Sequence, residues 1–186
     1  MNAKEWKYVS IDIETLGLDE NFCDIIEFGA VLDDLKTPLQ ELPRYHCYLT
    51  KYNNRYQGEA YAMSMHSDIL RRIANRESGY KYCPTELFSY QFRLWIDDFK
   101  LKDVVICGKN FAGFDLRFLN KIEFSKCLKF HHRILDVGSM FYDPKTDSVP
   151  PDLKECLKRS GVEKSINHTA IDDALDVIQC VRYHYR

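Results

Sequence analysis

The sequence predicts an α/β fold in which helices cover both faces of a mixed β-sheet. Short apolar segments with strand character fill the N-terminal quarter, and helical and strand-like segments alternate after it. The composition, 45% hydrophobic and 29% charged, is typical of a globular protein. A chain of 186 residues can bury a sizeable core without disulfides or a structural metal. We therefore expect a single domain over residues 1–186.

The predicted strands are short apolar runs bounded by polar or turn-forming residues. They cover residues 8–13, 24–32, 45–49, 103–107 and 132–136. Residues 51–62 are polar and rich in tyrosine, and we expect them to form a surface loop.

The predicted helices carry apolar residues at spacings of three and four. They cover residues 67–76, 84–99, 114–122, 153–160 and 171–183. Pro84 suits the first turn of the second helix, and Gly161 ends the fourth.

Charge and cysteine content narrow the function classes. The 26 basic and 28 acidic residues give a net charge of −2, which argues against a broad basic surface but leaves a local groove open. No window is apolar enough for a membrane span, and the N-terminus lacks the apolar stretch of a signal peptide. The 7 cysteines form no C-x-x-C pair, so we expect small buried thiols and a reducing, cytoplasmic location.

Two carboxylates end the first predicted strand. Side chains alternate along a strand, so Asp12 and Glu14 share one face, about 7 Å apart at their Cα atoms, whereas Val9, Ile11 and Ile13 point into a core. Two such carboxylates repel each other unless a cation or partner lies between them. The pattern alone also fits an ordinary polar strand end.

A third carboxylate lies on the apolar stripe of the helix predicted over residues 114–122. Asp115 falls among its apolar side chains, where a carboxylate is costly without a cation, a metal or several donors. The alternative is an aspartate that accepts hydrogen bonds from free backbone amides at the helix start.

The last helix begins with a capping box. Thr169 and Asp172 have the required spacing, which places His168 just outside the helix, where it can face a cleft. Asp173 borders the apolar stripe and is expected to face inward, whereas Asp172 is expected to cap. The same His-x4-Asp spacing recurs at His131 and Asp136, but on a strand this odd separation sends the two side chains to opposite faces, so we do not expect them to act as a pair. Asp136 can share a face with His132, and we interpret it as a structural carboxylate or as one that supports the site from behind.

Taken in order, these elements resemble the DEDDh-type 3′–5′ exonucleases, the DnaQ-like family that includes the proofreading epsilon subunit, ribonuclease T and oligoribonuclease. The matching side chains are Asp12, Glu14, Asp115, His168 and Asp173. The resemblance implies a ribonuclease H-like fold with a five-stranded mixed sheet whose second strand is antiparallel. The sequence departs from the family pattern at Lys109, where histidine is common, and at Leu16, where threonine is common.

The resemblance also implies a mechanism. Asp12, Glu14, Asp115 and Asp173 would hold two Mg²⁺ or Mn²⁺ ions, because ligand sets made only of oxygen select hard divalent cations. His168 would act as general base, and nucleoside 5′-monophosphates would leave one at a time from the 3′ end of DNA or RNA.

The expected substrate contacts surround these carboxylates. They are Thr15, Leu16, Gly17, His66, Asn110, Phe111 and Phe114. The assignment of His66 rests on a loose match, and a helix-capping or surface histidine is the alternative. The expected partner is single-stranded or 3′-overhanging nucleic acid, with no membrane, and a homo-oligomer is an option that the resemblance leaves open.

Two non-enzymatic functions are the alternatives, and each predicts something different of the sequence. A catalytically inactive nucleic-acid-binding domain on the same fold predicts that at least one acid is missing, yet all of them are present. A purely structural interaction domain gives Asp115 no reason to lie on an apolar stripe.

Overall fold

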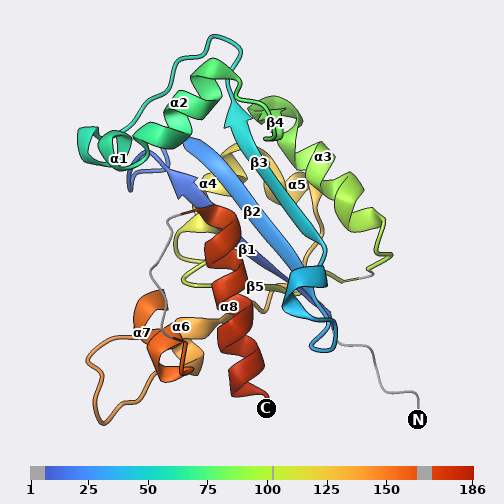
Figure 1. Cartoon of the computed structure of the whole chain (residues 1–186), viewed down its shortest axis with the longest axis vertical. Coiled ribbons are helices and arrows are strands. Elements are labelled where there is room, and N and C mark those ends of the chain that lie inside the picture. The colour runs from blue at the N-terminus through green and yellow to red at the C-terminus, as the bar shows by residue number, and fades with distance from the viewer. Residues whose placement is uncertain (1–6, 102, 163–168) are drawn as a thin grey trace.

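A six-stranded mixed sheet forms the centre of the molecule, with the strand order β4-β3-β2-β1-β5-β6 (Figure 1). The structure is a computed structural model that describes residues 7–101, 103–162 and 169–186. The strands are β1 (Tyr8–Thr15), β2 (Ile25–Asp33), β3 (Arg44–Thr50), β4 (Tyr82–Pro84), β5 (Ile106–Gly108) and β6 (Leu135–Asp136). β2 is antiparallel to both of its neighbours, and the other pairings are parallel. The predicted mixed sheet with an antiparallel second strand is confirmed.

The predicted number of five strands is wrong, because β4 adds a sixth. It is only three residues long and pairs with the end of β3 from Tyr48 to Thr50. A strand this short, ending in Pro84, shows no alternation over which a period could be recognised.

Eight α-helices occur in the described residues. They are α1 (Ala60–Met65), α2 (Ser67–Asn75), α3 (Thr85–Asp97), α4 (Asp115–Lys121), α5 (Phe124–Cys127), α6 (Val137–Met140), α7 (Leu153–Arg159) and α8 (Ala170–His184). The five predicted helices correspond to α2, α3, α4, α7 and α8. The predicted loop over 51–62 is wrong at its end, where α1 begins. α1, α5 and α6 have six residues or fewer, too few to show a helical period.

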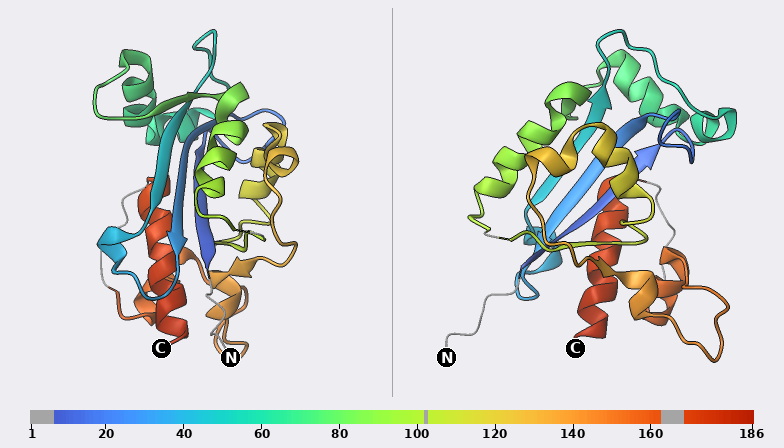
Figure 2. Two further views of the ribbon diagram at one scale, coloured as in Figure 1. Left: turned by 90° about the vertical axis from the view of Figure 1, so that its right-hand side faces the viewer. Right: turned by 180° about the vertical axis from the view of Figure 1, so that it is seen from behind.

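The helices lie in two layers, one on each face of the sheet (Figure 2). α3, α4 and α5 cover one face, where Val9, Ile11 and Ile13 join the phenylalanines of α3 in the larger core. α8 crosses the other face with α6 and α7, and its apolar stripe packs against Tyr8 and Val31. The strand alternation predicted for β1 is therefore confirmed, and it directs Asp12 and Glu14 toward the α8 layer.

All seven cysteines are free, and six of them are buried, as expected for small core residues. None of the helices within the described ranges is long and apolar enough to cross a membrane.

Candidate active site

α8 begins directly against the sheet, because β2 carries a glycine at the contact. A Cβ atom on Gly29 would lie 2.3 Å from the carbonyl carbon of Ala170 and 2.4 Å from the backbone nitrogen of Ile171. Gly29 is also the residue opposite Asp12 in the β1–β2 register. The first turn of α8 is therefore held over Asp12.

Three carboxylates converge at this contact. Asp12, Glu14 and Asp173 each offer a carboxylate oxygen, and these oxygens all lie within 4.8 Å of one another. Asp172 instead belongs to the cap, since its backbone N–H donates to the Thr169 hydroxyl at 3.4 Å and its carboxylate accepts from that hydroxyl at 2.9 Å. The predicted phase of the last helix, with Asp173 inward and Asp172 capping, is confirmed.

Asp115 lies near the cluster, although its oxygens are not among those that converge within 4.8 Å. β5 pairs with β1 only at Val9 and Ser10, so the later part of that strand edge is free for the first turn of α4. Asp115 is buried, and its carboxylate accepts hydrogen bonds from its own backbone N–H and from that of Ile13. Asp115 therefore has backbone donors, one from its own helix and one from β1, and it is also the nearby charge that most raises the pKa of Asp12. A role in holding a cation stays a prediction.

Burial and mutual repulsion make it energetically unfavourable for all the carboxylates of the cluster to be ionised at once. Burial, assisted by the charges of Glu27, Asp173 and Asp115, raises the pKa of Glu14 to about 8. Desolvation raises the pKa of Asp115 to about 7, although the two backbone donors oppose the rise. The pKa of Asp12 is also raised well above its ordinary value by burial and by its acidic neighbours. Such a group of carboxylates favours a bound cation.

Sequence reasoning missed a fifth carboxylate beside the cluster. Glu27 lies opposite Glu14 in the β1–β2 register and is fully buried. Its Oε1 accepts a hydrogen bond from Nε2 of His46 at 2.5 Å. The signal was present in the sequence, since Glu27 is the one charged residue in an apolar run of β2 from Ile25 to Leu32.

His66 lies against the cluster at the junction of α1 and α2. Its side chain is 6% exposed, and its Nε2 lies 3.5 Å from Oε2 of Glu14. The histidine side chain makes no capping hydrogen bond to α2. The alternative of a surface histidine is therefore wrong, and although His66 occupies the N-cap position of α2, its side chain does not cap the helix.

Two of the expected substrate contacts are ruled out by their surroundings. Phe111 is 1% exposed and packs in the larger core, so its ring offers no face to a base. Leu16 is buried as well, and its backbone N–H already donates to the carbonyl of Asp24 at 2.9 Å. Phe114 keeps partial exposure and stays a candidate.

Three of the remaining predicted residues are Thr15, Asp136 and His168. Thr15 donates its hydroxyl to the carbonyl of Gly17 at 2.8 Å, which shapes the turn after β1. Asp136 is structural as predicted, since it accepts from the backbone of Asn110 at 2.5 Å and caps α6. His168 lies outside the described residues.

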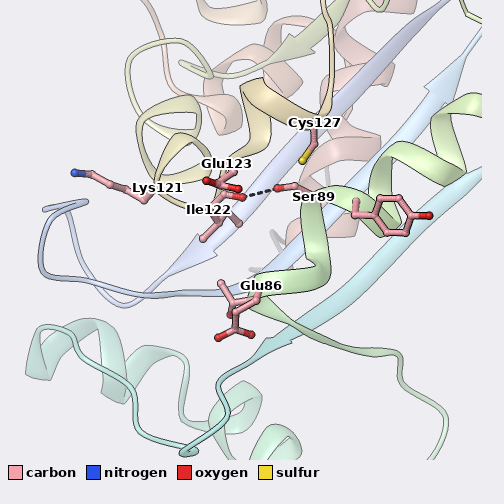
Figure 3. Close-up of a pocket in the computed structure, with 8 residues that line it drawn as sticks. Glu86, Ser89, Lys121, Ile122, Glu123 and Cys127 are labelled. Atoms are coloured by element: carbon pink, nitrogen blue, oxygen red, sulfur yellow. Dashed lines mark hydrogen bonds between the residues drawn. The ribbon is translucent and has the colours of Figure 1, made fainter.

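A separate cavity lies on the other face of the sheet. It has a volume of about 380 Å³ and is formed by α3 together with the segment from Lys121 to Cys127 (Figure 3). The hydroxyl of Ser89, which lines the cavity, donates a hydrogen bond to the backbone carbonyl of Ile122 at 2.6 Å. The lining includes none of the predicted site residues.

Comparison with known proteins decides the family. The RNase_T family model, described as an exonuclease, matches residues 9–181. This chain belongs to that exonuclease family. It is a 3′–5′ exonuclease of the DEDDh type, as the order of its acidic motifs predicts.

Related exonucleases match over nearly the whole chain. The oligoribonuclease of Acinetobacter baylyi is 26% identical over 199 residues, which cover 98% of this chain and 94% of the relative. The oligoribonuclease of Xylella fastidiosa is 27% identical over 194 residues, covering 97% and 88%.

Solved exonuclease structures share the fold. E. coli Exonuclease I in complex with a dT13 oligonucleotide superposes with a TM-score of 0.66 at 16% identity. The zinc-bound form of its complex with single-stranded DNA gives 0.67, also at 16% identity. Each alignment covers 95% of this chain, which spans only 40% of the length of Exonuclease I.

Proposed function

We propose that this exonuclease degrades single-stranded RNA oligonucleotides from the 3′ end and releases nucleoside 5′-monophosphates one at a time. The convergence of Asp12, Glu14 and Asp173 within 4.8 Å carries the catalytic part of the proposal. Full-length similarity to oligoribonucleases supports RNA as the polymer. The whole chain, residues 1–186, would act as one exonuclease domain.

The donor set fits two Mg²⁺ or Mn²⁺ ions held by Asp12, Glu14, Asp115 and Asp173. Carboxylate oxygens are the ligands that hard divalent cations prefer. The raised pKa of Glu14 reflects burial first and then repulsion from its acidic neighbours, and a bound cation would relieve that repulsion. One structure of the complex of E. coli Exonuclease I with single-stranded DNA is a zinc-bound form, so that relative binds a divalent ion, although zinc is neither of the two ions proposed here. When bound, the ions would polarise the scissile phosphate and stabilise developing negative charge.

Side chains and backbone groups of the protein would accept the proton and bind the terminal nucleotide. His168 would accept the proton of the attacking water, a role for which an ordinary imidazole is suited near neutral pH. His66, buried beside Glu14, would line the space for the terminal nucleotide. Backbone groups of Thr15 and Gly17, together with Asn110 and Phe114, would contact the last sugar and base, and stacking on Phe114 needs no sequence preference.

A cleavage panel tests this proposal. Single- and double-stranded RNA and DNA, from two to about thirty nucleotides long, are incubated at equal concentrations of ends with Mn²⁺. We expect mononucleotide release, with short single-stranded RNA cleaved fastest. If duplex DNA is cleaved as fast as short single-stranded RNA, or faster, the proposed substrate is wrong. Such a result would not contradict the proposed metal centre.

Location and assembly stay predictions. Seven free thiols suit a reducing cytoplasm. Size-exclusion chromatography with light scattering measures whether the exonuclease forms a homo-oligomer.

A further inference from the structure

Glu27 is a buried carboxylate for which neither the fold nor the ligand set just proposed accounts. It lies near the start of β2, an inner and wholly buried strand, and its side chain is on the same face as Glu14. Directly opposite residues on antiparallel strands have Cβ atoms about 4.5–5.5 Å apart. Two glutamates therefore lie side by side under the first turn of α8.

Only half of the Glu27 carboxylate has a hydrogen-bond donor. Oε1 accepts from Nε2 of His46 at 2.5 Å, which fixes the orientation of the side chain. Oε2 is buried and accepts no hydrogen bond from any residue that the structure describes. A buried carboxylate oxygen without a donor is costly unless a positive charge lies nearby.

The position of Glu27 makes it a neighbour of the centre rather than one of its ligands. The oxygens that converge within 4.8 Å come from Asp12, Glu14 and Asp173, and none comes from Glu27. It nevertheless lies directly opposite Glu14 and two residues before Gly29, the partner of Asp12, so its charge lies close to any cation held by these ligands. The negative charge of Glu27 repels the ionised carboxylates of the cluster, and for the same reason it attracts a cation bound between them.

We propose that Glu27, held by His46, is a non-ligating carboxylate that strengthens divalent-cation binding at Asp12, Glu14 and Asp173 through its charge. This inference rests on the proposed metal centre. It assigns Glu27 a positioning and electrostatic role, with no contact to substrate. The alternative is that Glu27 and His46 form a structural pair that stabilises the sheet.

The variant Glu27→Gln separates the two roles, because glutamine keeps the shape and the hydrogen bond to His46 but removes the charge. The matched control is Asp33→Asn, at the other end of β2. Asp33 is equally buried, but it lies far from the cluster, where its carboxylate accepts from Nη2 of Arg182 at 2.5 Å and from the Tyr8 hydroxyl at 2.7 Å. Neutralising Asp33 removes an ion pair and should lower the melting temperature without affecting cation binding.

Calorimetric titration of Mn²⁺ into the full chain, together with metal-free melting curves, tests the inference. We expect Glu27→Gln to raise the Mn²⁺ dissociation constant about 10- to 100-fold, the range typical of groups that support metal ligands. Its metal-free melting temperature should stay at or above that of the wild type. Asp33→Asn should bind Mn²⁺ within about threefold of the wild type and melt lower, since it loses an ion pair and weakens hydrogen bonds that lie far from the cluster.

Three results would overturn the inference. Wild-type affinity in Glu27→Gln would show that the charge is irrelevant to cation binding. A fall in melting temperature as large as that of Asp33→Asn, or a failure to fold, would show a structural pair. If the wild type itself binds no Mn²⁺, the proposed metal centre fails first and the role of Glu27 falls with it.

Discussion

Gly29 and Ala170 are in such close contact that no side chain fits between them: a Cβ on Gly29 would lie 2.3 Å from the Ala170 carbonyl carbon. Because Gly29 pairs with Asp12, this contact sets the height of α8 above the first strand exactly where the carboxylates meet. The distance from Asp173 to Asp12 and Glu14 thus depends on one missing side chain in β2.

Gly29→Ala should therefore damage the site and the fold together. The added methyl group meets backbone atoms, which cannot rotate away, so the first turn of α8 must lift from the sheet. We expect a loss of about 1–3 kcal/mol in the free energy of unfolding and a weaker affinity for Mn²⁺. Chemical denaturation and calorimetric titration measure the two effects.

Gly79→Ala is the matched control for that change. Gly79 has a φ of +89° but no atom within 4 Å of an added Cβ. Alanine there should cost about 1–2 kcal/mol of backbone strain and leave Mn²⁺ affinity intact. If both variants keep wild-type affinity, the spacing of α8 does not control the site.

The neighbouring aspartates of α8 should respond differently to neutralisation. Asp173→Asn removes a carboxylate that converges with Asp12 and Glu14, and nearly all turnover should be lost. Asp172→Asn alters only the cap around Thr169, so most turnover should remain, with about 1 kcal/mol less stability. Steady-state cleavage rates decide the point, and equal loss in both variants would contradict the assigned phase of the helix.

Without divalent ions, the protein should become less stable as the pH rises. The pKa of Glu14 is raised from 4.5 to about 8 and that of Asp115 from 3.8 to about 7. The folded state then holds more protons than the unfolded chain between these values, so the stability present at low pH is lost as the pH rises through the folded pKa values.

Melting curves in EDTA between pH 5 and pH 8.5 measure this dependence. We expect the melting temperature to fall across that interval and saturating Mn²⁺ to remove most of the fall, because cations relieve the repulsion. Glu14→Gln should flatten the metal-free curve. A metal-free melting temperature that rises toward pH 8.5 would show that the carboxylates are not crowded.

His168→Ala should separate proton transfer from metal binding. As a general base, His168 should contribute roughly 10²- to 10⁴-fold to turnover and nothing to Mn²⁺ affinity. Asp12→Ala should instead weaken Mn²⁺ binding itself. The rise of activity with pH through the imidazole pKa should also disappear in His168→Ala. If the histidine variant loses Mn²⁺ as severely as Asp12→Ala, His168 is a metal ligand.

The sequence was sufficient for the parts of the site that obey local periodicity. The alternation along β1 placed Asp12 and Glu14 on one face, and the helical stripe separated Asp173 from Asp172. The third carboxylate, Asp115, could be recognised because a charge on an apolar stripe needs a reason.

The parts that escaped prediction depend on contacts between distant segments. β4 and α1 are too short to show a period, and their positions depend on β3 and α2. The pairing of Glu27 with His46 depends on the register between β2 and β3, which no single segment encodes. Phe111 was misassigned because an aromatic residue in a loop can be a stacking surface or a core residue, and only packing distinguishes them.

The most direct test of the central claim is a time course with a 5′-labelled single-stranded RNA oligonucleotide. With Mn²⁺, the full chain should shorten the RNA from its 3′ end in one-nucleotide steps. In excess EDTA, or with Asp12→Ala in place of the wild type, the RNA should stay intact because the carboxylate cluster is then empty or incomplete. Undiminished shortening in EDTA, or cleavage that begins at internal positions, would contradict a metal-dependent 3′–5′ exonuclease built on Asp12, Glu14, Asp115 and Asp173.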